Sequence, residues 1–114
     1  MYIYDKTHEL AKALSQSPEY KVYKAAKERI DSNPKAKEML NDFKKKQFEL
    51  QAAQMTGQKI DDAKISQIQS LYQVLTLNPE IAQYLNAELT FNKIISDVYK
   101  IIGDAVEIDL DFMK

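Results

Sequence analysis

The stretch Asn33–Gly57, NPKAKEMLNDFKKKQFELQAAQMTG, contains the start and the end of one long helix. The side-chain oxygen of Asn33 can accept a hydrogen bond from an unpaired backbone N–H, and Pro34 suits the first helical position because its missing N–H costs nothing there. Gly57 can adopt the left-handed conformation that commonly follows a helix. The stretch therefore predicts a helix from Pro34 to about Thr56. Its broad apolar face comprises Ala36, Met39, Leu40, Phe43, Phe48, Leu50, Ala52 and Met55.

Two further segments, Ser17-Pro18-Glu19 and Asn78-Pro79-Glu80, repeat this start signal, and apolar residues follow each of them at helical spacing. The acids Asp61-Asp62 favour one more helix start, because they complement the positive end of the helix dipole. Gly103 either ends or bends the last helix, or the helix continues toward Phe112. We therefore expect five helices, at about Ile3 to Gln16, Pro18 to Asp31, Pro34 to Thr56, Asp61 to Leu77, and from Pro79 onward.

These elements predict an all-α fold in a single domain spanning residues 1–114. The short connection at Gly57 predicts that the third and fourth helices form a long antiparallel hairpin. We expect the long fifth helix to pack along the hairpin, with the first two helices as a smaller appendage. The apolar face of the fifth helix looks wider than a small monomer can cover, which predicts a homodimer or higher oligomer. The predicted self-association or partner surface is Phe91, Ile94, Ile95, Val98, Ile101 and Ile102.

The composition offers little for catalysis. The chain of 114 residues has no Cys, which excludes disulfides and thiolate ligands, and its net charge of -1 gives no general attraction to nucleic acid. His8 is the only histidine and is expected on the surface. The acids Asp61 and Asp62, and the later group Asp104, Glu107, Asp109 and Asp111, are expected to be helix-start or solvated residues. From the sequence we predict that the protein is not an enzyme, and we assign no catalytic, cofactor-binding or metal-binding residue.

Neither a signal peptide nor a membrane-spanning stretch is recognisable, so we expect a cytoplasmic protein without membrane insertion. Charge is nevertheless uneven along the chain. Residues 20–46 carry nine basic and four acidic side chains, a net charge of +5, whereas residues 78–114 carry three basic and seven acidic ones, a net charge of -4. Lys44, Lys45 and Lys46 form the densest basic run and are a candidate basic patch. Such a patch could contact RNA or an acidic partner, but three consecutive lysines point in three directions on a helix.

The central motif Phe-x-x-x-Gln-x-x-x-Gln-x-x-Gln-Met-x-Gly is carried here by Phe43, Gln47, Gln51, Gln54, Met55 and Gly57. Together with Ser17-Pro18-Glu19-Tyr20 and Asn78-Pro79-Glu80-Ile81, it resembles the YlbF/YmcA family of small helical proteins of Gram-positive bacteria, most closely the YheA-like branch. The resemblance covers essentially the full length. It implies an all-α fold with a long central hairpin, self-association and a cytoplasmic location.

Better-studied members of that family are regulators. They influence competence, sporulation and biofilm formation, and they act in a complex that directs messenger-RNA processing by a membrane-associated endoribonuclease. Some carry C-terminal cysteines associated with iron–sulfur clusters, but this chain has no cysteine, so that cofactor is not expected here. The sequence and the resemblance together predict a non-enzymatic regulator or adaptor that binds itself and an unidentified regulatory protein. The alternative is an RNA-binding module that uses the basic face from Lys35 to Lys46.

Overall fold

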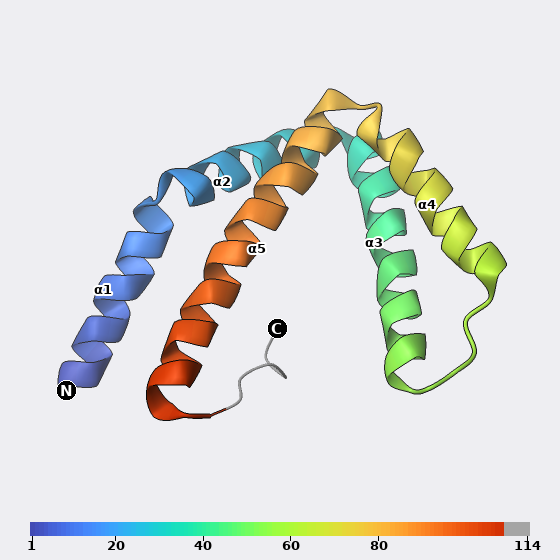
Figure 1. Ribbon diagram of the computed structural model, residues 1–114. Helices are drawn as coiled ribbons and strands as arrows, with labels where there is room; N and C mark the ends of the chain where they lie inside the picture. Colours follow the sequence, from blue (N-terminus) through green and yellow to red (C-terminus); the bar gives the residue numbers. More distant parts are fainter. Residues whose placement is uncertain (109–114) are drawn as a thin grey trace. The chain divides into compact units, whose positions relative to one another are not determined.

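The computed structural model describes residues 1–108, and within this part of the chain every regular element is an α-helix. The five helices are α1 (Tyr2–Gln16), α2 (Pro18–Asp31), α3 (Pro34–Met55), α4 (Asp62–Thr76) and α5 (Pro79–Val106) (Figure 1). The all-α prediction is confirmed. Gly103 lies inside α5 and does not end it, and the expected continuation toward Phe112 falls outside the described residues.

Each residue that precedes a proline caps the helix that follows it. Asn78 Oδ1 accepts hydrogen bonds from the backbone N–H groups of Glu80 at 2.9 Å and Ile81 at 3.4 Å. Ser17 Oγ and Asn33 Oδ1 each accept from the N–H three residues further on, at 3.2 and 3.3 Å. Since the first N–H groups of a helix have no partner within it, these three side chains fix where α2, α3 and α5 begin.

The end of α3 is set by Gly57, as predicted. Its φ of 74° is in the left-handed region, its N–H bonds to the carbonyl of Gln54 at 3.3 Å, and the N–H of Gln58 bonds to the carbonyl of Ala53 at 3.0 Å. This pair of bonds is a Schellman motif, which satisfies carbonyls that the last turn leaves unpaired. The chain then turns through residues 58–61 into α4, whose first turn is capped by Asp61 Oδ1 accepting from Ala63 N–H at 2.9 Å.

The chain divides into two compact units, whose boundaries fall within α2 and α5. Unit 2 is residues 26–84 and contains the α3–α4 hairpin, which confirms the predicted pairing of these helices. The rings of Phe43 on α3 and Tyr72 on α4 lie 5.7 Å apart between centroids. This unit holds eight of the nine buried apolar residues among those described: Ala26, Ile30, Ala36, Leu40, Phe43, Leu75, Ile81 and Tyr84.

Unit 1 combines residues 1–25 with the chain from Leu85 onward, so it contains α1, the start of α2 and most of α5. We expected the first two helices to form a separate appendage. Instead, the start of α2 contacts α5 through Tyr20 and Tyr23, so both helices belong to the same unit. Within the described part of unit 1, only Ala87 and Gly103 are buried, and α1 has no buried residue. The hydrophobic core therefore lies in unit 2. That residues 1–114 make one domain stays a prediction.

Candidate partner-binding surface

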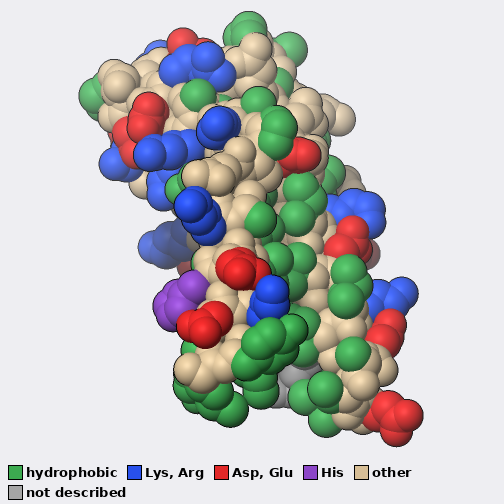
Figure 2. All heavy atoms as spheres, turned by 90° about the vertical axis from the view of Figure 1, so that its left-hand side faces the viewer, with side chains coloured by type: hydrophobic (Ala, Val, Ile, Leu, Met, Phe, Trp, Pro, Cys, Tyr) green, Lys and Arg blue, Asp and Glu red, His purple; other side chains and the backbone are tan. Residues whose placement is uncertain are grey.

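The large apolar side chains of unit 1 are mostly uncovered. On α5, the exposed fraction is 68% for Ile101 and 44% for Ile102, and Leu89 and Val106 are also exposed. On α1, the same holds for the first residues of the chain, where hydrophobic side chains gather on the face that also carries the histidine (Figure 2). Clustered apolar surface of this kind usually marks a protein–protein interface. The residues concerned on and beside α1 are Met1, Tyr2, Ile3, Tyr4 and Leu10.

The six positions predicted for self-association do not share one environment. Ile101 and Ile102 are exposed, and Phe91 is half-buried. Three others, Ile94, Ile95 and Val98, are half-buried as well. The C-terminal end of the predicted surface is thus the part available to a partner, while its N-terminal end is partly used within unit 1. Partner binding at these six residues stays a prediction.

Phe91 belongs to an aromatic cluster with two tyrosines of α2. Its ring stacks on Tyr23, with centroids 5.9 Å apart and an angle of 13° between the planes, and it meets Tyr20 at 5.3 Å in a tilted arrangement. Aromatic pairs of this geometry contribute about 0.5–1.5 kcal/mol beyond the area they bury. The sequence showed each ring at helical spacing, but no local signal indicated that the ring of α5 would meet those of α2, which lie far away along the chain.

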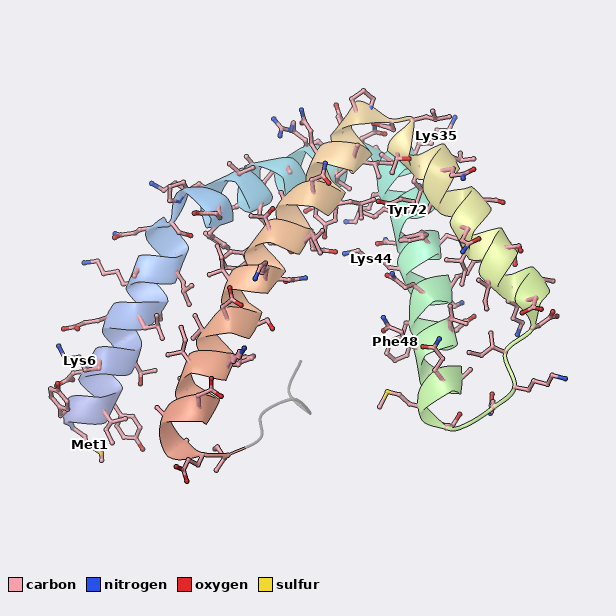
Figure 3. The ribbon with its side chains drawn as sticks, in the orientation of Figure 1. Met1, Lys6, Lys35, Lys44, Phe48 and Tyr72 are labelled. Atoms are coloured by element: carbon pink, nitrogen blue, oxygen red, sulfur yellow. The ribbon has the colours of Figure 1, made fainter. Side chains whose placement is uncertain are left out.

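The three consecutive lysines have three different surroundings. Lys44 is half-buried, and its Nζ donates a hydrogen bond to the Oη of the buried Tyr84 at 2.9 Å. Lys46 Nζ forms an ion pair with Asp42 Oδ2 at 2.7 Å, and Lys45 is exposed. Lys44 and Phe48 both lie on α3, and their side chains point away from α4, the helix that carries Tyr72 (Figure 3). The run is therefore not a single patch of free ammonium groups.

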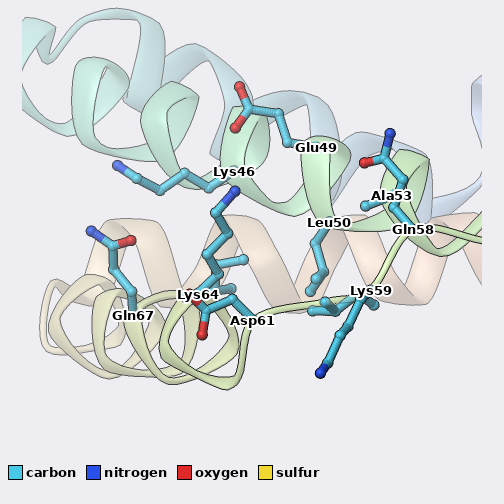
Figure 4. A pocket seen from close by; sticks show the side chains of 11 residues that line it. Lys46, Glu49, Leu50, Ala53, Gln58, Lys59, Asp61, Lys64 and Gln67 are labelled. Carbon is cyan, nitrogen blue, oxygen red and sulfur yellow. The ribbon is translucent and has the colours of Figure 1, made fainter.

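A small hollow lies at the closed end of the hairpin, between the end of α3, the connecting segment and the start of α4 (Figure 4). Its volume is about 170 Å³, and its apolar lining comes from Leu50, Ala53, Ile60 and Ile68. Three lysines and two carboxylates also line it: Lys46, Lys59, Lys64, Glu49 and Asp61. Sites for drug-sized ligands have volumes of about 300–1,000 Å³, so this hollow suits nothing larger than a side chain or a very small molecule.

The other candidate groups of the sequence are separate from one another. His8 is exposed on α1, and Asp61 serves as the cap of α4. Asp109 and Asp111 lie outside the described residues. Within residues 1–108, no three side chains among His, Asp and Glu come together as a metal site would require, and no helix is long and apolar enough to cross a membrane.

The fold and this surface define a class: an all-helical protein in which one unit holds the core and the other exposes apolar helix faces. The family model described as control of competence regulator ComK, YlbF/YmcA, matches residues 3–107. The chain therefore belongs to the YlbF/YmcA family.

Relatives of high identity carry the name UPF0342. One from Caldicellulosiruptor bescii is 48% identical over 105 residues, covering 92% of this chain and 88% of the relative. Another, from Symbiobacterium thermophilum, is 45% identical over 112 residues, covering 98% of this chain and the whole of the relative. The family resemblance seen in the sequence is thus confirmed over nearly its full length.

Two solved structures share the fold. A protein of unknown function (DUF964) from Bacillus stearothermophilus has a TM-score of 0.82 at 22% identity, covering 94% of both chains. A structure of Bacillus subtilis RicA in complex with RicF has a TM-score of 0.61 at 22% identity, covering 93% of this chain and 94% of the other. At this identity the comparison supports the fold alone.

Proposed function

We propose that this protein is a cytoplasmic regulatory adaptor that acts through protein–protein contacts, and that it associates with itself through the uncovered apolar surface of unit 1. The observation that carries the proposal is the poor burial of that unit. Its described residues, 1–25 and 85–108, bury only Ala87 and Gly103. Family membership supports a regulatory role, and the known regulators of the family suggest a link to RNA processing, competence, sporulation or biofilm control.

Helix α1 supplies the physical argument for a partner. Isolated helices of about 12–15 residues are only marginally stable in water, and most helical stability in proteins comes from packing an apolar face. Helix α1 has 15 residues and no buried side chain. A second copy that covered Met1 to Tyr4 and the end of α5 would provide the missing packing. The RicA–RicF complex shows that a protein with this fold can bind another protein.

The alternative function, RNA binding along the face from Lys35 to Lys46, has weaker support. Lys44 is bonded to Tyr84, Lys46 is paired with Asp42, and Lys37 Nζ lies 3.5 Å from Asp31 Oδ1. Part of the positive charge along this face is therefore already balanced or bonded within the protein, which weakens its attraction for phosphates. We therefore place self-association and protein partners first.

Light scattering coupled to size-exclusion chromatography tests the proposal. We expect a dimer or higher oligomer at micromolar concentration, and we expect Ile101→Glu to shift it toward the monomer, because a charge would enter the apolar interface. Val74→Glu, at an exposed apolar position of α4, is the matched control and should leave the mass unchanged. A monomeric wild-type chain at this concentration contradicts the proposal.

Crosslinking in native cell extract followed by mass spectrometry tests the adaptor role separately. The wild-type chain should capture itself and at least one regulatory protein reproducibly, and Ile101→Glu should lose the self-crosslinks. Recovery of the chain alone, with no other protein enriched over the Val74→Glu control, contradicts the adaptor role while leaving self-association intact.

A further inference from the structure

The glutamine-rich motif of α3 contains residues that the fold does not explain. Two of its members have clear structural roles, since Phe43 is buried in the core of unit 2 and Gly57 ends the helix. Met55, in contrast, is 88% exposed. The three glutamines of the motif are also exposed and make no hydrogen bond with any described residue: Gln47, Gln51 and Gln54. These side chains neither pack nor cap the hairpin, so they can contact a partner.

The unexplained residues lie on one face of α3. At about 100° per residue, the three glutamines, Met55 and the 70% exposed Phe48 fall within an arc of about 120°. We term this face the α3 amide stripe, and it comprises Gln47, Phe48, Gln51, Gln54 and Met55. It extends about 12 Å along the helix. Gln51 is its middle residue, both along the helix and around it.

The α3 amide stripe and its surroundings are uncharged. Glu49 is the only charged residue from Gln47 to Gln58, and it lies about 200° around the helix from Gln51. Its side chain lines the hollow at the closed end of the hairpin instead (Figure 4). The neighbouring helix α4 has no charged residue from Ile65 to Thr76. Loss of charge together with exposed Phe and Met side chains is typical of the centre of a protein–protein interface, whereas nucleic acid is bound by cations.

We propose that the α3 amide stripe of one copy packs antiparallel against the same stripe of a second copy, around a two-fold axis at Gln51. In a two-fold contact both copies use the same patch, so the residue in the middle meets its own counterpart. A charged side chain in that place would face its like. A glutamine amide has two donors and an acceptor, so it can pair with an identical amide. This self-complementarity selects a second copy as the occupant.

The lysines near the stripe do not oppose this pairing. Lys44, which is bonded to Tyr84, and Lys45 lie seven and six residues before Gln51. In an antiparallel contact centred on Gln51, each of them would be about 18–21 Å along the helix from its counterpart in the second copy. Salt screens exposed charges beyond about 8–10 Å, so their mutual repulsion is weak.

The contact lies entirely within unit 2 and does not depend on the self-association proposed for unit 1. It involves five side chains of each copy, whereas a stable interface has about 20–30 residues on each side. It should therefore be weaker than the association through unit 1 and should form at higher protein concentration. Copies joined through unit 1 would then assemble further through α3.

Sedimentation velocity over a range of protein concentrations tests the proposal. The mass of the wild-type chain should rise above that of its micromolar form as the concentration approaches the millimolar range. Gln51→Glu places two carboxylates at the axis, so it should weaken this second step at least about tenfold and leave the micromolar form unchanged. Glutamine and glutamate have similar helix propensities, and the helical circular dichroism should stay the same.

Gln67→Glu is the matched control. This glutamine is also exposed on the hairpin, but it lines the hollow together with Glu49 and lies outside the α3 amide stripe. The variant has the same change of charge as Gln51→Glu, so any effect of net charge on association should be equal in the two. Gln67→Glu should show the same rise in mass as the wild type.

A mixing experiment tests whether the occupant is a second copy. Gln51→Lys should lose the second step just as Gln51→Glu does, because two ammonium groups would then meet at the axis. An equal mixture of the two variants should regain the rise in mass, since a glutamate of one copy can face a lysine of another. A contact with any other surface would not be restored in this way.

Each other result overturns a specific statement. A wild-type mass that does not rise with concentration, or that rises equally in Gln51→Glu, overturns the pairing of the stripes and leaves the association through unit 1 standing. Loss of the rise in both charge variants without recovery in the mixture overturns the second copy as the occupant. A wild-type chain that is monomeric at micromolar concentration and gains mass only through Gln51 contradicts the association through unit 1 and supports this contact.

Discussion

Replacing Gly57 with alanine should destabilise the hairpin by about 1 kcal/mol, and the structure identifies the cause. The φ of Gly57 is 74°, and an added methyl group would meet no heavy atom within 4 Å. Steric crowding from neighbours is therefore absent, and the cost comes from holding an L-residue in the left-handed conformation, about 1–2 kcal/mol. Part of this cost is offset because alanine lowers the entropy of the unfolded chain, by about 0.4–1 kcal/mol.

Urea denaturation followed by helical circular dichroism measures this change. At a slope of about 1–3 kcal/mol per molar urea, Gly57→Ala should lower the midpoint by about 0.3–1 M. All variants must be compared at one protein concentration, because self-association would make stability concentration-dependent. Gly57→Asn should retain much of the stability, since asparagine tolerates the left-handed region better than alanine does.

Gln58→Ala is the matched control. Its side chain is exposed and forms no hydrogen bond in the part of the chain described, so its stability should stay within the range of about 0.5 kcal/mol typical of surface substitutions. If Gly57→Ala is as stable as the wild type, the left-handed turn does not form in solution, and the Schellman ending of α3 is wrong. If asparagine and alanine lower the midpoint equally, the loss does not come from backbone conformation.

Three further substitutions test the fold by urea denaturation. Asn78→Ala should cost about 1 kcal/mol, because it removes the acceptor for two N–H groups at the start of α5; an unchanged midpoint would show that the cap is dispensable. Phe43→Ala should cost about 3–5 kcal/mol by opening a cavity in the core of unit 2, and a loss below about 1 kcal/mol would contradict its burial. Phe91→Ala should cost less than Phe43→Ala, since Phe91 is only half-buried; it should also reduce tyrosine near-ultraviolet dichroism from the cluster with Tyr20 and Tyr23, and an unchanged spectrum would argue against the stacking.

The elements of this fold could be predicted because their signals are local. Asn33 and its N–H partner are three residues apart, and the bonds around Gly57 close within five residues. Because the bonded residues are only three to five positions apart, the residue types within one short segment are enough to predict these interactions. The hairpin could be predicted because two long helices joined by a connection of only a few residues pack antiparallel.

The candidate surface could be predicted only in part, because its residues look alike in the sequence. Phe91 and Ile101 both belong to the predicted partner surface of α5, yet Phe91 stacks on Tyr23 while Ile101 is 68% exposed. The difference arises from contacts with α2, which lies far away in the sequence. Likewise, Lys44 and Lys45 are neighbours, but only Lys44 reaches Tyr84, which is 40 residues further along the chain. Periodicity shows that a face is apolar; it does not show what covers it.

The uneven distribution of the core links stability to association in this protein. Unit 2 buries Leu75 and Ile81 fully and has its own hydrophobic centre, so its helices can be stable in a single copy. The described part of unit 1 buries only Ala87 and Gly103, and α1 buries nothing, so a partner that covered its apolar faces would add to its stability. On the self-association proposed above, the order of unit 1 should depend on protein concentration and on competing partners, because binding to the apolar faces of α1 and α5 would favour its folded form.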